Sequence, residues 1–145
     1  EIKECQQNHF PMLFVDRITE AVPGEYAKGF KNFSYNEWFF PTHYEDDPNV
    51  PGFIQVEALV QVFLMTFLTL DEYRGMKTSF VSIDKVKFRK KIVPGDKLEM
   101  MAELKSFRRG IASGLVTSSV DASNAASAEF VVCIPEILSS YKPSS

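Results

Sequence analysis

One stretch decides the fold: FIQVEALVQVFLMTFLTL, residues 53–70, is apolar almost throughout. A helix that is apolar on nearly every side belongs inside a protein or inside a membrane. The stretch is nearly long enough to span a bilayer, but Glu57 and two glutamines interrupt it and the sequence contains no second apolar span. We therefore predict a buried central helix. It should open at Pro51 and Gly52, because proline is tolerated in a first helical turn.

The sequence around this helix follows the two-residue alternation of β-strands. In residues 97–105 the apolar side chains share one parity and the charged side chains share the other, which predicts a half-buried strand. Similar segments are expected at residues 12–18, 26–33, 86–92, 111–120 and 126–134, with turns at Pro23-Gly24 and Pro94-Gly95-Asp96. One apolar helix can cover the inner face of a strongly curved antiparallel sheet. The prediction is an α+β fold in one domain, residues 1–145, with a frayed tail from Ser139.

Composition and charge narrow the classes of function. The chain has 145 residues and a formal net charge of −3, which argues against general binding of nucleic acids or membrane surfaces. Cys5 and Cys133 are far apart and match neither a disulfide framework nor a metal-ligand spacing. No signal segment opens the chain and no glycine-rich phosphate loop is present, so we expect a cytoplasmic protein without a metal or a cofactor.

His43 is the first candidate catalytic residue. The chain has two histidines, His9 and His43, and histidine is the side chain that titrates near neutral pH. His43 lies in the stretch FFPTHY just before the predicted helix, where aromatic neighbours could keep water away. The plainer interpretation is a histidine that is held by a backbone carbonyl. His9 is expected to be structural.

Glu57 is the second candidate, because its neighbours at one-turn spacing include Phe53, Ile54 and Val60. Burial disfavours the charged form of a carboxylate, and enzymes use this effect to obtain a general acid at neutral pH. The alternative is a structural glutamate that is stabilised by the helix N-terminus or by Gln61. A histidine on a loop and a glutamate in the helix that follows can face one cleft, the first as base and the second as acid.

Basic residues are concentrated in residues 85–91. The alternating positions there are Lys85, Lys87, Arg89 and Lys91. On an extended strand these side chains share one face. Further basic residues, expected on a neighbouring strand and its turn, are Lys105, Arg108 and Arg109. One interpretation is a solvated face that protects a sheet edge, and the other is a docking site for an acidic partner, since the local charge is opposite to the net charge.

An ordered series of motifs extends over nearly the whole chain. It comprises NHFPMLFVDR (8–17), NEWFF (36–40), THY (42–44), PNVPGFIQVEALVQ (48–61), IDKVKFR (83–89) and VPGD (93–96). Together these motifs resemble the FabZ-type 3-hydroxyacyl-(acyl carrier protein) dehydratases of fatty-acid synthesis. In that family a histidine and a glutamate form the catalytic pair, and the matching positions are His43 and Glu57.

The resemblance implies a hot-dog fold, in which a curved antiparallel sheet wraps around one long helix. It also implies homodimers whose sheets join, or a trimer of such dimers, with each site taking its histidine from one subunit and its glutamate from the other. Gly52 matches a helix-opening glycine whose N–H binds the thioester carbonyl, and Phe53 and Gln61 are expected to contact the substrate. The implied substrate is a 3-hydroxyacyl thioester of acyl carrier protein or coenzyme A. An acidic carrier protein is the partner that the basic residues would attract.

The departures from the family pattern flank the proposed site. Thr42 and Tyr44 stand where the family has glycine and phenylalanine, and Asp47-Pro48-Asn49-Val50 replaces a Gly-Asn-Pro-Val-Met-like loop. We expect these changes to affect the choice of substrate more than the type of reaction. Two other functions stay open: a hot-dog acyl thioesterase that uses Glu57 and a water molecule, and an acyl-binding subunit without turnover.

Overall fold

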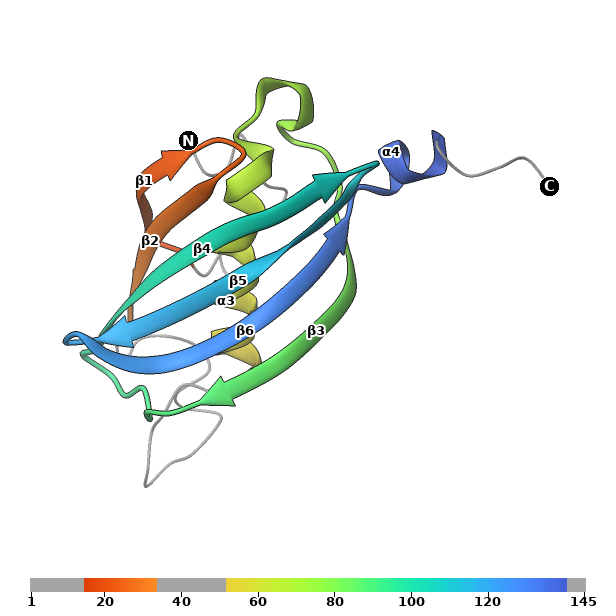
Figure 1. The fold of residues 1–145 in the computed structure, drawn as a ribbon. Helices are drawn as coiled ribbons and strands as arrows, with labels where there is room; N and C mark the ends of the chain where they lie inside the picture. Colours follow the sequence, from red (N-terminus) through yellow and green to blue (C-terminus); the bar gives the residue numbers. More distant parts are fainter. Residues whose placement is uncertain (1–14, 34–51, 141–145) are drawn as a thin grey trace.

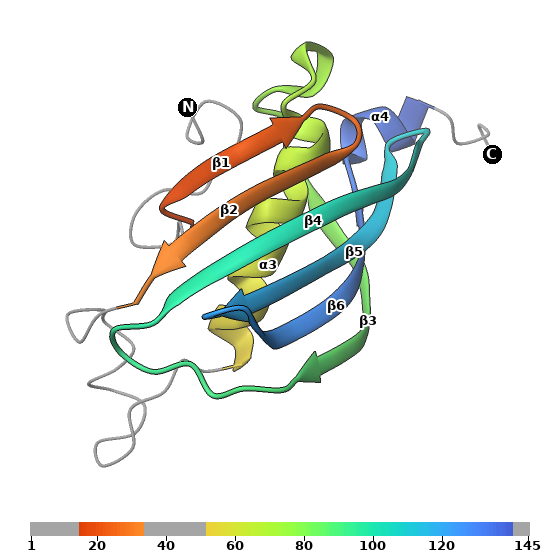
Figure 2. The same cartoon turned by 60° about the vertical axis from the view of Figure 1, so that its left-hand side comes forward.

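The computed structural model describes residues 15–33 and 52–140, which form a curved antiparallel sheet around one long helix (Figure 1). The six strands of the sheet lie in the order β1-β2-β4-β5-β6-β3. The strands are β1 (Arg17–Val22), β2 (Tyr26–Asn32), β3 (Ser79–Phe88), β4 (Lys97–Arg108), β5 (Ile111–Val120) and β6 (Ser123–Cys133). The helices are α3 (Gly52–Leu68), the short 3₁₀ helix η1 (Asp71–Tyr73) and α4 (Pro135–Ser140). Figures 1 and 2 show α3 on the concave side of the sheet, which confirms the predicted α+β architecture.

The predicted boundaries are wrong at several ends. The strand expected at residues 86–92 is β3, which ends at Phe88, because the N–H groups of Arg89 and Lys90 both donate to Ala125 O and the chain then leaves the ladder. The helix ends at Leu68, before the expected residue 70, and the Leu70 N–H donates to Phe67 O in a tight turn. The first strand starts later than expected, and residues 12–14 lie outside the described residues. The tail expected to fray from Ser139 includes the end of α4, and residues 141–145 are not described.

The middle of α3 packs tightly on the sheet. Phe63 and Phe67 are fully buried, and the Phe63 ring stacks on Phe130 at a centroid distance of 6.0 Å. Gly114 on β5 makes this approach possible, since a Cβ atom there would lie 2.6 Å from the Phe63 ring and 2.2 Å from Glu103 O. The side chains of a close-packed interior cannot yield by that much. The position of α3 on the sheet, and hence the direction in which its N-terminus points, depends on glycine at this position. None of the helices in the described segments is long and apolar enough to cross a membrane.

Two tight turns set the register of the strands. Arg109 and Gly110 join β4 to β5, and Asp121 and Ala122 join β5 to β6, and all four residues have positive φ angles between 50° and 82°. Two consecutive residues with positive φ are typical of the type I′ turn, whose twist matches that of a β-hairpin. These turns place the Arg108–Arg109 end of β4 at the end of the sheet where β3 begins, because Ile111 and Ser79 both pair with Cys133.

Strand β3 is an edge of the sheet, and all of its residues are exposed. Its side chains include Phe80, Val81 and Phe88, which are 50%, 56% and 49% exposed. The pairing of β3 with β6 shifts at Phe80/Ser82 and again at Asp84/Lys87, and Lys85 has a φ of 51° at the second shift. An exposed apolar edge strand is a surface on which another chain can pair.

Candidate active site

Glu57 lies on the second turn of α3 and is half-buried. Gln61, one turn later and fully buried, donates a hydrogen bond from Nε2 to Glu57 Oε1 at 3.0 Å. This bond orients the carboxyl group relative to the helix. The contact with Gln61 agrees with both the structural and the catalytic interpretation of Glu57, since a catalytic acid also has to be oriented. The expected contact between Gln61 and substrate stays a prediction.

The N-terminus of α3 forms the neighbouring part of the site. Gly52 is the first residue of the helix, so its N–H lies among the first-turn groups that have no acceptor within the helix. The partial positive charge at a helix N-terminus favours an oxygen that gains negative charge. Gly52 is exposed and Phe53 is 65% exposed, so this turn can be reached from solvent. Figures 1 and 2 place it beside the end of β3, and the nearest atoms to a Cβ built on Gly52 belong to the Phe88 ring.

His43 lies outside the described residues, as do His9, Thr42, Tyr44 and the segment at 47–50. The segment that carries His43 leads directly into Gly52, so His43 precedes the helix that carries Glu57. The pairing of His43 with Glu57 stays a prediction.

The basic residues do not share one face of a regular strand. The register shift between Asp84 and Lys87 interrupts the alternation, and Lys85 lies at that shift with Nζ 3.8 Å from Glu129 Oε2. Arg89 and Lys91 follow the end of the strand. The expectation of one alternating strand through residue 91 was therefore wrong. These residues do lie at the end of the sheet that holds the N-terminus of α3, since Phe88 contacts Gly52.

The grouping of Arg108 and Arg109 with this basic run was also wrong. We expected them on a strand beside the basic run, but β5 and β6 separate β4 from β3. Arg108 pairs with Ile111, whereas Phe88 pairs with Ala126 near the other end of β6. The two arginines therefore lie at the opposite end of the sheet from Lys87 and Arg89.

Other polar features lie away from Glu57. On the β1–β2 hairpin, Tyr26 donates a hydrogen bond to Glu20, which lowers the pKa of the Glu20 carboxyl and raises the pKa of the Tyr26 hydroxyl. Cys133 is buried, and within residues 15–33 and 52–140 no three His, Cys, Asp or Glu side chains gather as a metal site would require. The described residues thus offer one carboxyl group, Glu57, near the N-terminus of α3, and no metal cluster.

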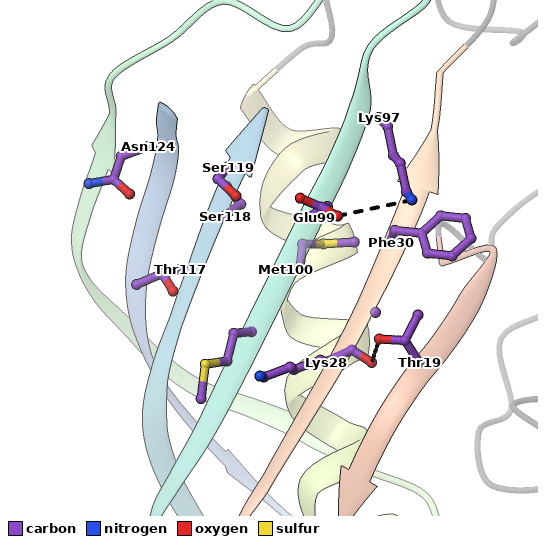
Figure 3. Close-up of a pocket in the computed structure, with 12 residues that line it drawn as sticks. Thr19, Lys28, Phe30, Lys97, Glu99, Met100, Thr117, Ser118, Ser119 and Asn124 are labelled. Atoms are coloured by element: carbon purple, nitrogen blue, oxygen red, sulfur yellow. Dashed lines mark hydrogen bonds and ion pairs between the residues drawn. The ribbon is translucent and has the colours of Figure 1, made fainter. Parts of the chain in front are cut away.

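Residues of the described segments also line hollows away from Glu57. A hollow of about 700 Å³ lies at the C-terminal end of α3 and includes Leu64, Leu68 and Met76. A second one, of about 330 Å³, lies on the face of the sheet opposite α3 (Figure 3). Lys97 crosses it with Nζ 4.0 Å from Glu99 Oε1. The sheet separates this second hollow from Glu57, so it does not belong to the candidate active site.

Comparison with known sequences supports the motif analysis. The family profile described as a FabA-like domain matches residues 7–129. A 3-hydroxyacyl-(acyl-carrier-protein) dehydratase FabZ from Clostridium novyi (strain NT) is 37% identical over 134 residues, covering 92% of this chain and 94% of the relative. The FabZ dehydratase from Clostridium botulinum (strain Okra / Type B1) is 40% identical over 134 residues, covering 92% of this chain and 93% of the relative. The resemblance to FabZ dehydratases is confirmed.

Comparison with solved structures supports the fold. A chain of the dehydratase heterocomplex ApeI:P from Xenorhabdus doucetiae has a TM-score of 0.80 at 12% identity, covering 92% of this chain and 90% of that chain. The PH1136 protein from Pyrococcus horikoshii has a TM-score of 0.70 at 12% identity, covering 90% and 91%. The hot-dog fold is thereby confirmed. The sequence match over most of its length shows that this chain belongs to the FabA-like domain family, as a relative of the FabZ 3-hydroxyacyl-(acyl-carrier-protein) dehydratases.

Proposed function

We propose that this protein removes water from a 3-hydroxyacyl thioester, carried on acyl carrier protein, to give a trans-2-enoyl thioester. The observation that carries the proposal is the placement of Glu57, a half-buried carboxyl oriented by Gln61, one turn from the exposed N-terminus of α3. Membership of the family of FabZ relatives supports the same reaction.

The reaction needs a base, an acid and a donor to the thioester oxygen. In our proposal His43 takes the proton from Cα, and the electron pair of that C–H bond forms the enolate. The Gly52 N–H donates a hydrogen bond to the enolate oxygen, and the helix N-terminus stabilises its charge. Protonated Glu57 then gives its proton to the β-hydroxyl, the Cβ–O bond breaks, and water leaves as the C=C bond forms.

A direct assay tests this reaction. The protein is incubated with 3-hydroxyacyl thioesters of several chain lengths, on coenzyme A and on carrier protein, while the absorbance of the conjugated enoyl product is followed. We expect enoyl thioester to form without release of free thiol. Release of thiol would instead indicate the thioesterase that the sequence left open, and no product on any carrier or chain length would indicate a silent acyl-binding subunit.

We also propose that the working unit is a homodimer, with a second copy of the chain paired along β3. The apolar residues Phe80, Val81 and Ile83 on this edge are 50%, 56% and 38% exposed. A strand that pairs with its own copy across a two-fold axis joins two sheets into one and covers both edges. The N-terminus of α3, which contacts β3 through Phe88, then lies close to the second subunit.

We further propose that the basic residues at the end of β3 and directly after it, Lys87 and Arg89, attract the carrier protein, and charge reversal tests this role. We expect Lys87→Glu combined with Arg89→Glu to slow turnover of carrier-bound substrate by about tenfold at low salt, with a smaller effect at high salt, because long-range attraction is screened by salt. Turnover of a small thioester without carrier or coenzyme A should change little. The measurement is kcat/KM on both substrates over a range of salt concentrations.

The matched control reverses the same charge at the other end of the sheet. Lys105→Glu combined with Arg108→Glu should leave both activities unchanged, since β5 and β6 separate β4 from β3. If the Lys87 and Arg89 variant loses activity equally on both substrates, these residues shape the site itself. If it loses none, the basic run is a solvated edge.

A further inference from the structure

The ring of Phe88 and the first residue of α3 fit together closely. A Cβ atom built on Gly52 would lie 3.2 Å from Cζ and 3.5 Å from Cε2 of Phe88, and its three nearest heavy atoms all belong to this ring. At such distances the ring has to move by a few tenths of an ångström to admit a side chain at residue 52. The two residues come from segments far apart in the sequence, one at the end of β3 and the other at the start of α3.

The backbone of Phe88 is well anchored. Phe88 is the last residue of β3 and pairs with Ala126 of β6. The N–H groups that follow it, from Arg89 and Lys90, donate to Ala125 O at 2.7 and 3.2 Å. The Phe88 ring, which is 49% exposed, therefore extends from a backbone that is held in the sheet.

The first turn of α3, residues 52–55, is buried on one side, where Ile54 and Gln55 are 1% and 5% exposed. The helix packs mainly on β2, β4 and β5 through buried side chains such as Phe63 and Phe67 in its second half. Gly52 and Phe53, by contrast, are exposed. The ends of helices move more than their middles, and a hydrogen-bond donor works in catalysis only when it is held in place beforehand.

We propose that Phe88 is a positioning residue for dehydration. Its ring holds the first turn of α3 at a fixed distance from the sheet and excludes water from one side of that turn, so that the Gly52 N–H stays directed at the thioester oxygen. This inference rests on the proposed function and adds a reason for glycine at residue 52, because a methyl group there displaces the ring. Phe88 acts through Gly52 and does not touch the reacting atoms.

A double-mutant cycle between the two residues tests the proposal. Gly52→Ala and Phe88→Leu should each lower kcat by about tenfold, since a shift of about 1 Å in a catalytic group costs up to a hundredfold. KM should change by less than about threefold, because the interaction that is lost forms in the transition state. The double variant should also lose about tenfold, and not a hundredfold, because both substitutions remove the same contact. Phe30→Leu, on the outer face of β2, is the control and should leave kcat unchanged.

If the wild type dehydrates the thioester, any one of three results would contradict the inference. The first is a hundredfold loss in the double variant, which would show that the residues act independently. The second is a rise in KM with unchanged kcat in Phe88→Leu, which would make the ring part of a binding wall only. The third is dissociation of Phe88→Leu into monomers on sedimentation, which would assign the ring to assembly. A wild type that dehydrates no thioester would contradict the proposed function instead, so the two failures can be told apart.

Discussion

We expect His43→Ala and Glu57→Gln each to lower the turnover of a 3-hydroxyacyl thioester by about a hundredfold or more, because each removes one partner in proton transfer. The glutamine substitution is informative, since its amide oxygen can still accept the hydrogen bond that Gln61 donates to Glu57 at 3.0 Å. The geometry of the second helical turn should therefore persist while the transferable proton is lost. The measurement is kcat from the rate of enoyl product formation, with circular dichroism to verify folding.

The control is an exposed carboxylate away from the site. Glu103 lies on β4 and is exposed, and Glu103→Gln should have normal activity. A variant of His43 or Glu57 that keeps near-normal turnover would remove that residue from the catalytic pair. A variant that unfolds can be replaced by His43→Gln or Glu57→Asp, in which the change of shape is smaller.

The central helix and the inner strands could be predicted because burial requires apolar side chains, and these form a recognisable pattern in each segment. Strand β5 (Ile111–Val120) has the predicted bounds, and its side chains alternate between a buried and a more exposed face. Residues 97–105 lie within β4, where the alternation is equally regular up to Leu104. The helix was identified because its apolar run is too long and too uniform for a strand. In each case the side chains that contact the core determine the pattern.

Strand β3 could not be placed correctly because its sequence lacks the pattern that burial imposes on an inner strand. All of its residues are exposed, and two register shifts interrupt the two-residue period. The predicted segment, 86–92, overlaps only the end of β3 and contains alternating basic residues, Lys87, Arg89 and Lys91, which resemble a half-buried strand. An edge strand has a pairing partner on one side only, so its position in the sheet is weakly encoded in its own sequence.

The alternation of apolar and polar residues also does not reveal the order of the strands in the sheet. Arg108 and Lys87 were grouped because both belong to basic strands, yet pairing of β4 with β5 and of β6 with β3 puts them at opposite ends. Register follows from turns such as Arg109-Gly110, which the hydrophobic pattern does not reveal. Glu57 could be singled out from the sequence because it is a carboxylate within an apolar helix, whereas its pairing with His43 stays a prediction. The contact between Phe88 and Gly52 had no sequence signal, since it joins residues from two distant segments.

Subunit mixing tests whether one site is built from two chains. Each single variant, His43→Ala or Glu57→Gln, should be nearly inactive as a homodimer. In a heterodimer of the two, one site combines the intact His43 of one subunit with the intact Glu57 of the other, and the second site lacks both. If the two variants are co-expressed with different tags and the heterodimer is isolated, it should have about half of the wild-type turnover, since a two-fold dimer has two equivalent sites.

If each site is built from two chains, pairing of the subunits along the exposed strand β3 is required for activity. Ile83→Lys places a charge on β3, where the side chain is 38% exposed and would be covered by the second copy. Burying an unpaired charge is strongly unfavourable, so this variant should be monomeric on sedimentation and inactive. Isolated heterodimers of the two catalytic variants without activity would show that each chain carries its own complete site. Activity in a monomeric Ile83→Lys would lead to the same conclusion, because a site that needs His43 from one subunit and Glu57 from the other cannot form in a single chain.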